Sequence, residues 1–402
     1  MNKMSLSYLF CSFLLIFACK KDPVTPPIDN NDYQLKTIWE FQFPDSLPTY
    51  GSMEPLLYEN LILSSYQSIT SPMNEIVLAL NKETGEIIWE WDDYIRPVPQ
   101  RVRGSQRSRI YDNVIALCSG QDNYGIDINS GSTIWATNNE FGGGRISGFN
   151  DVLFHTETFG LAPSGDSSNI LIGNIYSGSW EKVVGVAKVD EYEVRLTTPT
   201  QFIKSNNDTL IVYHNGQFTY ENIIERADLY CYNLTQNEME WITEDISSSG
   251  STNNRASVIE GDKLYFAGKW DLICIDMPSG DEIWRHNFYH DYQGSNTVIY
   301  NNLIIHVLDN GDLIALNKYT GNLEWVNESL TGCCTELRVY GNRVYFGNTK
   351  LYIVDANSGN LLYKFNSPHQ GGSFINAISV DLENEKMYTS DGRYIMCMEL
   401  PE

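Results

Sequence analysis

One short hairpin pattern recurs along the whole chain. The stretch "LNKETGEIIW" ends at Trp89, and "ALNKYTGNLEW" ends at Trp325, far later in the chain. In both copies an Asn lies four residues before a turn Gly, and a Trp lies four residues after it. A Thr-Gly pair between two apolar, alternating segments predicts two β-strands joined by a tight turn with a positive φ angle at the glycine. The chain is therefore built from repeated β-hairpins. This repetition constrains the fold more than any other feature of the sequence.

Further copies vary the pattern without losing it. In the copy "CYNLTQNEMEW", Asn237 replaces the turn glycine, because Asn also tolerates the left-handed region. We expect each closing aromatic side chain to lie flat on the next repeat and to bury a large area there. The predicted docking aromatics are Trp39, Trp89, Trp135, Trp241, Trp284, Trp325 and Tyr363, with a weaker copy at Trp180.

Each hairpin is preceded by a second pair of strands with its own tight turn, such as "YEN" at 58–60 and "YGN" at 340–342. A unit of four antiparallel strands that recurs about every forty to fifty residues is typical of propeller blades. An eighth unit is split between the chain ends, with three strands in 373–400 and one in 34–43. Pairing these segments removes two exposed sheet edges. We predict an all-β, eight-bladed propeller of four-stranded blades, closed by the N-terminal strand.

The N-terminal segment predicts export. The apolar run from Leu6 to Ala18 is short for a membrane span and follows a lysine, so residues 1–18 are interpreted as a signal peptide. The tetrad Ile16-Phe17-Ala18-Cys19 resembles a bacterial lipobox, which implies lipidation of Cys19; an ordinary signal with a chance cysteine is the alternative. Residues 19–32 are polar and proline-rich, which predicts a flexible tether before a propeller over 33–402.

The net charge of the chain limits the kinds of partner that it can bind. The chain has 51 acidic and 27 basic residues and a net charge of -24, which repels the phosphates of nucleic acids. We therefore expect no nucleic-acid partner.

The innermost strands of a propeller line its axis, and aligning them places one polar residue of each at a common level near the channel mouth. Three arginines at this level could hold a small anion or a glycan, such as a carboxylate or a sulfated sugar. Alternatively, Arg and Glu pair with one another along a solvated channel wall. The aligned residues are Glu54, Arg107, Arg145, Arg255, Asn296 and Glu336.

The cysteines divide into two groups. Cys231, Cys274 and Cys397 lie on third strands where other blades have Ala or Gly, so they are interpreted as buried packing thiols. Cys333 and Cys334 are adjacent, and their Cα atoms are about 3.8 Å apart, closer than a relaxed disulfide prefers. This pair is either a strained disulfide that faces a ligand, or a structural pair or free thiols.

The repeat Ala-x-Asp/Asn-x-x-Thr/Ser-Gly-x-x-x-Trp resembles that of quinoprotein-type β-propellers, the family of pyrroloquinoline quinone (PQQ) dehydrogenases and their non-enzymatic relatives. Motif copies cover nearly all of 33–402. With a lipid anchor and no extra domain, the chain looks most like the propeller lipoproteins of the outer-membrane β-barrel assembly machinery. The resemblance implies a scaffold in the cell envelope, on the periplasmic or surface face of the outer membrane, that binds envelope proteins and needs no cofactor.

No residues match the calcium ligands and aspartate base of a PQQ dehydrogenase, and no other catalytic motif is present. The function predicted is therefore a membrane-anchored, non-enzymatic scaffold for protein interaction. The alternatives are a binder of small anions or glycans at the channel mouth, and a PQQ-dependent dehydrogenase with calcium. Two insertions, 160–169 and 215–228, are candidate recognition loops.

Overall fold

The computed structural model describes residues 35–44, 53–67, 75–95, 108–119, 122–138, 146–156, 167–187, 193–196, 199–218, 224–247, 257–268, 270–288, 296–308, 310–328, 330, 335–374 and 376–402. Within these ranges the chain forms strands and turns, and it contains no helix that is long and apolar enough to cross a membrane. The predicted signal peptide, Cys19 and the whole predicted tether lie outside them.

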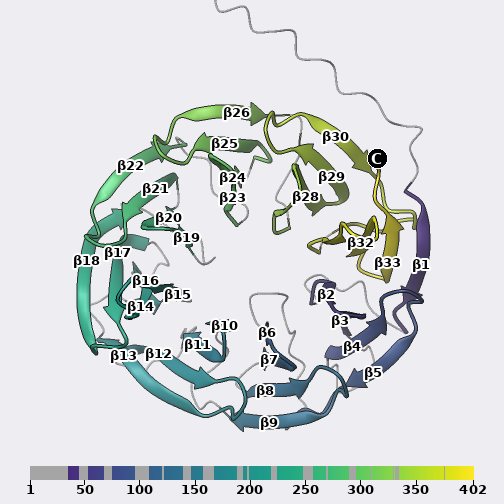
Figure 1. Cartoon of the computed structure of the whole chain (residues 1–402), viewed down its shortest axis with the longest axis horizontal. Coiled ribbons are helices and arrows are strands. Elements are labelled where there is room, and N and C mark those ends of the chain that lie inside the picture. Colours follow the sequence, from purple (N-terminus) through teal and green to yellow (C-terminus); the bar gives the residue numbers. More distant parts are fainter. Residues whose placement is uncertain are drawn as a thin grey trace, which may run out of the picture.

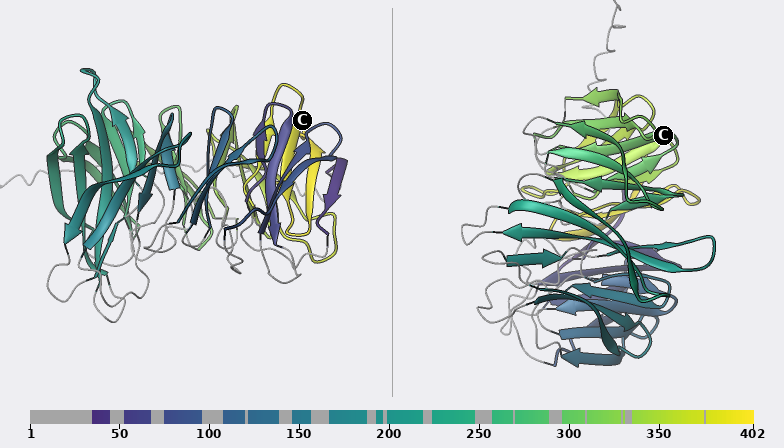
Figure 2. Two further views of the ribbon diagram at one scale, coloured as in Figure 1. Left: turned by 90° about the horizontal axis from the view of Figure 1, so that it is seen from below. Right: turned by 90° about the vertical axis from the view of Figure 1, so that its left-hand side faces the viewer.

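Eight antiparallel sheets surround a central axis as the blades of a propeller (Figure 1), and their strands run between the two faces of the ring (Figure 2). In blades 1 to 7 the chain starts at the axis and ends at the outer wall. This arrangement confirms the predicted all-β, eight-bladed fold.

The first three blades have four strands each. Blade 1 contains β2 (Leu56–Tyr58), β3 (Leu61–Gln67), β4 (Glu75–Asn81) and β5 (Ile87–Trp91). Blade 2 contains β6 (Ser108–Tyr111), β7 (Val114–Ser119), β8 (Asp122–Asp127) and β9 (Thr133–Asn138). Blade 3 contains β10 (Ile146–Phe149), β11 (Val152–Thr156), β12 (Ser167–Asn174) and β13 (Trp180–Ala187).

Blade 4 differs from the prediction of four strands. It contains β14 (Glu193–Leu196), β15 (Thr200–Ile203), β16 (Thr209–Phe218), β17 (Ile224–Asn233) and β18 (Glu238–Ser247). Two short strands share the inner edge of β16, because β15 pairs with residues 209–212 and β14 with residues 215–218. The insertion at 215–228 thus contributes to lengthened strands, and one inner strand is too short to cover them.

The remaining blades return to four strands. Blade 5 contains β19 (Val258–Glu260), β20 (Lys263–Ala267), β21 (Asp271–Asp276) and β22 (Glu282–Asn287). Blade 6 contains β23 (Val298–Tyr300), β24 (Leu303–Val307), β25 (Leu313–Asn317) and β26 (Leu323–Asn327). Blade 7 contains β27 (Arg338–Tyr340), β28 (Arg343–Asn348), β29 (Lys350–Asp355) and β30 (Leu361–Phe365).

Blade 8 closes the ring with both ends of the chain. β31 (Ser379–Asp381), β32 (Lys386–Ser390) and β33 (Tyr394–Glu399) are joined at the outer wall by β1 (Thr37–Gln42). β1 pairs antiparallel with β33, with Trp39 opposite Cys397. The predicted closure by the N-terminal strand is therefore confirmed, and the pairing holds the two ends of the propeller together.

The recurrent turn has a simple physical basis. The Asn81 side-chain oxygen accepts hydrogen bonds from the main-chain N–H groups of Glu83 and Thr84, at 2.8 and 3.1 Å. Gly85 follows with a φ angle of 73°, and its N–H donates to the Asn81 main-chain oxygen at 2.8 Å. Asn237 takes the same left-handed conformation, with a φ angle of 58°. The Asn or Asp and the turn Gly therefore recur because together they close the hairpin.

The tryptophans join successive blades. A Cβ atom built on Gly131 would lie 2.7 Å from the Trp89 ring, and the Trp89 indole donates to the Ile128 main-chain oxygen at 2.9 Å. The turn glycine thus gives the ring of the preceding blade a flat surface. The same stacking occurs for Trp39 on Gly85, Trp135 on Gly178, Trp241 on Gly280, Trp284 on Gly321 and Trp325 on Gly359.

Tyr363 makes different contacts. Its hydroxyl donates to the main-chain oxygen of Glu402, and the Arg343 guanidinium lies 5.8 Å from the centre of its ring. Blade 8 has no turn glycine of the repeat to receive an aromatic ring, so Tyr363 contacts the C-terminal residues instead.

Opposite each docking tryptophan, the neighbouring strand of its blade carries a small residue. Gly125 pairs with Trp135, and a Cβ atom there would lie 2.2 Å from the ring. Cys231, Cys274 and Cys397 pair with Trp241, Trp284 and Trp39 and are buried free thiols. Burial raises the thiol pKa of Cys231 to about 12 and those of Cys274 and Cys397 to about 11.

Candidate functional site: the axial channel

Three of the six residues predicted at the channel mouth are described, namely Glu54, Asn296 and Glu336. Each lies two positions before an innermost strand, in blades 1, 6 and 7 respectively. Arg107, Arg145 and Arg255 lie outside the described residues, and so do Cys333 and Cys334. The predicted arginine level and the adjacent cysteine pair therefore stay predictions.

Glu54 and Glu336 converge on Arg338, the first residue of β27. The Arg338 Nη2 atom lies 2.6 Å from Glu54 and 3.0 Å from Glu336, and Glu54 is only 5% exposed. Burial alone lowers the pKa of Arg338, but the two carboxylates outweigh this effect and raise the pKa overall. Glu54 comes from blade 1 and Arg338 from blade 7, so this ion pair joins the blades on either side of blade 8.

Asn296 joins blades 6 and 7 at the same level. Its side-chain oxygen accepts from the Leu337 N–H at 2.6 Å, and its amide donates to the Leu337 main-chain oxygen at 3.2 Å. In the described part of the channel wall, Glu54 and Glu336 therefore pair with Arg338, and Asn296 pairs with the main chain of blade 7. Sequence reasoning missed Arg338, although Arg338 begins β27 two residues after Glu336, a spacing that places two side chains on one face of an extended segment.

Arg109 occupies the position in blade 2 that Arg338 occupies in blade 7. Arg109 pairs with Ala116 two residues before the β6–β7 turn, just as Arg338 pairs with Tyr345 before the β27–β28 turn. Its Nε atom is buried and has no hydrogen-bond partner among the described residues. Burial lowers the pKa of this guanidinium. Two equivalent arginines thus have different surroundings in one channel.

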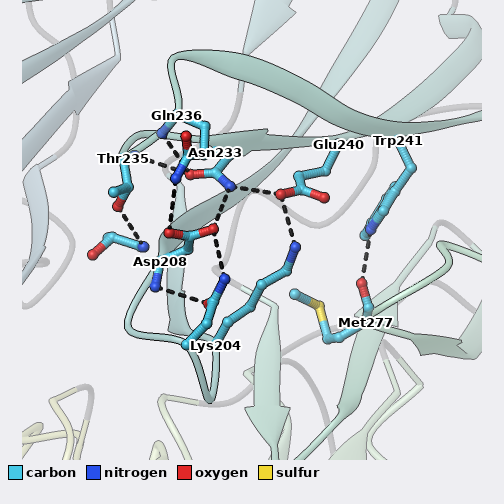
Figure 3. Close-up of polar contacts among 10 residues, drawn as sticks. Lys204, Asp208, Asn233, Thr235, Gln236, Glu240, Trp241 and Met277 are labelled. Carbon is cyan, nitrogen blue, oxygen red and sulfur yellow. Dashed lines mark hydrogen bonds and ion pairs between the residues drawn. The ribbon is translucent and has the colours of Figure 1, made fainter.

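A polar network connects the two turns of blade 4 (Figure 3). The Asn233 amide donates to Asp208 at 3.1 Å and to Glu240 at 2.6 Å, and Lys204 lies 2.7 Å from Glu240. Hydrogen bonds from Asn233 and Gln236 hold the pKa of Asp208 below its usual value. Lys204 and Asn233 do the same for Glu240. These polar groups satisfy one another, so the network stabilises the one turn of the repeat that has Asn in place of Gly.

A second polar cluster lies at the ring closure. The His369 Nδ1 atom is 2.7 Å from Asp391, and its Nε2 atom is 3.1 Å from Glu40 of β1. The imidazole stacks on the Tyr394 ring, with 3.6 Å between ring centres. The connection between blades 7 and 8 is therefore attached to both strands that close the propeller.

Fold and repeat define the class of protein: an eight-bladed propeller of PQQ-like repeats whose described channel wall contains paired charges. Residues 36–155 and 251–373 match the family model described as outer membrane protein assembly factor BamB, so the chain belongs to that family. No curated protein sequence matches the chain significantly.

Solved structures share the fold at low sequence identity. BamB from Moraxella catarrhalis is 17% identical with a TM-score of 0.60, and the match covers 91% of this chain and 100% of that one. The quinohemoprotein alcohol dehydrogenase ADHIIG from Pseudomonas putida HK5 is 12% identical with a TM-score of 0.66, covering 92% and 77%. The designed protein Ika8 is 11% identical with a TM-score of 0.64, covering 91% and 100%. At these identities the likeness establishes the fold alone.

Proposed function

We propose that this protein is a lipid-anchored scaffold that holds a protein partner in the bacterial envelope, as part of outer-membrane assembly. Membership of the BamB family carries the proposal. The signal-like residues 1–18 and the lipobox-like tetrad ending at Cys19 support a lipid anchor in the outer membrane.

The outer wall of three consecutive blades supports protein docking. Ile38, Ile88 and Ile134 each precede the docking tryptophan of β1, β5 and β9, and they are 40%, 50% and 43% exposed. These strands form the outer edges of blades 8, 1 and 2, which are neighbours in the ring (Figure 1). Exposed large apolar side chains on the outer strands of adjacent blades favour contact with another protein. We assign the partner to this arc, which we call the isoleucine arc.

The test is recovery of partners from solubilised envelopes with the tagged, full-length chain. We expect an envelope protein to be recovered with the wild type, and recovery to fall at least tenfold with the double variant Ile88→Lys/Ile134→Lys. Ile283→Lys changes the equivalent exposed position in blade 5, across the ring from blade 1, and serves as the control. Failure of the wild type to recover any envelope protein would overturn the proposed scaffold function. Equal losses in the double variant and in Ile283→Lys would overturn docking on the isoleucine arc.

The anchor has its own test. The Cys19→Ala variant should appear in the soluble fraction of fractionated cells and should not incorporate labelled fatty acid. An anchor at Cys19 is contradicted if this variant stays with the membrane and keeps the label.

A further inference from the structure

Within the described part of the chain, the axial channel contains a cation without a counter-ion. Arg109 lies on β6, the innermost strand of blade 2, beside β10, the innermost strand of blade 3 (Figure 1). A Cβ atom built on Gly148 of β10 would lie 3.5 Å from Arg109 Cγ, so the stem of the arginine packs against that strand. The stem of Arg109 therefore lies at the inner end of the seam between blades 2 and 3.

The described residues leave the Nε atom of Arg109 unsatisfied. They place no hydrogen-bond acceptor on its buried Nε atom, and none of their carboxylates forms an ion pair with it. Burial also lowers the pKa of Arg109, and no described acid offsets that effect. A partly buried charge without a partner is costly, and the chain has 51 acidic residues from which a partner could have come.

Arg338 shows how the same position is neutralised elsewhere. It lies at the equivalent place on the innermost strand of blade 7 and binds the carboxylates of Glu54 and Glu336. In the sequence, the residue two positions before Arg338 is Glu336, whereas the residue two positions before Arg109 is Arg107. In the sequence, an acid thus precedes one arginine and a second base precedes the other.

The chemistry of the site selects an anion. A guanidinium presents a planar set of N–H donors that matches two oxygens of a carboxylate, sulfate or phosphate. β6 and β10 are the terminal strands of their sheets, so each also has a main-chain edge that no described strand covers. We propose that Arg109 binds a small oxyanion at the axial end of the seam between blades 2 and 3.

This site is independent of protein docking on the isoleucine arc. A bound oxyanion would neutralise Arg109 as Glu54 and Glu336 neutralise Arg338. Because only the folded protein forms the site, binding raises the melting temperature, and the increase saturates as the anion concentration rises.

The experiment follows the melting temperature of the purified protein in sodium sulfate, in inorganic phosphate and in sodium chloride, at matched ionic strength. We expect a saturable increase with sulfate or phosphate over chloride in the wild type. Arg109→Gln should abolish the increase, and Arg109→Lys should weaken the apparent affinity at least tenfold because Lys lacks the planar fork. Arg338→Gln, the matched control, should retain the increase whatever its own stability.

An equal response to all three salts in the wild type would overturn the proposal, as would an unchanged response in Arg109→Gln. If Arg109→Gln does not fold, crystals of the wild type grown with selenate decide the question. Anomalous density within hydrogen-bond distance of the Arg109 guanidinium supports the site, whereas ordered selenate elsewhere and none at Arg109 contradicts it.

Discussion

The substitution Gly131→Ala tests the contact that joins blades 1 and 2. Gly131 has a φ angle of 69°, where an Ala costs about 1 kcal/mol in backbone energy. The new Cβ atom would lie 2.7 Å from the ring of Trp89, so the indole must move. Displacement removes its hydrogen bond to the Ile128 oxygen, worth about 1 kcal/mol, and disturbs packing worth about 1 to 2 kcal/mol. We expect a total loss of about 3 to 4 kcal/mol.

The control is Gly261→Ala in the turn between β19 and β20. Gly261 has a φ angle of 57°, but a Cβ atom added there would meet no other atom within 4 Å, so only the backbone cost of about 1 kcal/mol remains. Urea unfolding followed by tryptophan fluorescence gives both free energies, and near-ultraviolet circular dichroism reports the position of the indole. Equal losses in the two variants would refute stacking of Trp89 on Gly131 as a main link between blades.

Buried and paired groups give three further predictions. Burial lowers the pKa of His155 to about 4 and that of His214 to about 3, so between these values and pH 6.5 the unfolded chain binds protons that the folded protein does not. The free energy of unfolding is therefore highest above pH 6.5, and at pH 5 it is lower by about 2 kcal/mol per histidine. The His155→Gln/His214→Gln variant should show a smaller shift in urea midpoint between pH 7.5 and 5 than the wild type. Cys231, Cys274 and Cys397 should not react with a thiol reagent at pH 8 until the protein unfolds, because burial raises their thiol pKa values; rapid labelling of the native protein contradicts their placement. Asn233→Ala should cost about 3 kcal/mol in urea unfolding because it breaks contacts to Asp208 and Glu240, whereas Asn81→Ala in an ordinary turn should cost about 1 kcal/mol. Equal costs would show that the blade 4 network adds nothing.

The fold was predictable because its rules are local and repeated. A turn such as Asn81 to Gly85 fixes its own hydrogen bonds, and the Trp that follows needs only a glycine in the next blade. The N-terminal segment supplies one unpaired strand, and the C-terminal blade has only three strands of its own. Pairing the two was therefore the single way to close the ring. Residues close in sequence carried most of this information, and only the closure of the ring joined distant segments.

The channel was less predictable because its contacts join distant parts of the chain. Arg338 meets Glu54 across blade 8, and nothing near either residue in the sequence indicates the pair. Arg109 looks like an ordinary strand residue until its equivalence to Arg338 is known. Likewise, the lengthened strands of blade 4 were interpreted as an insertion, because the pairing of both β14 and β15 with β16 depends on tertiary structure.

The most direct test of the closed ring is a disulfide between β1 and β33. Gln42 and Tyr394 are opposite each other in the antiparallel register, and we expect the Gln42→Cys/Tyr394→Cys variant to form this bond on mild oxidation. The closed propeller predicts an intramolecular cross-link and a higher urea midpoint that reduction reverses. Thiols that stay free under oxidation, or cross-link only between molecules, would contradict closure of the propeller by its N-terminal strand.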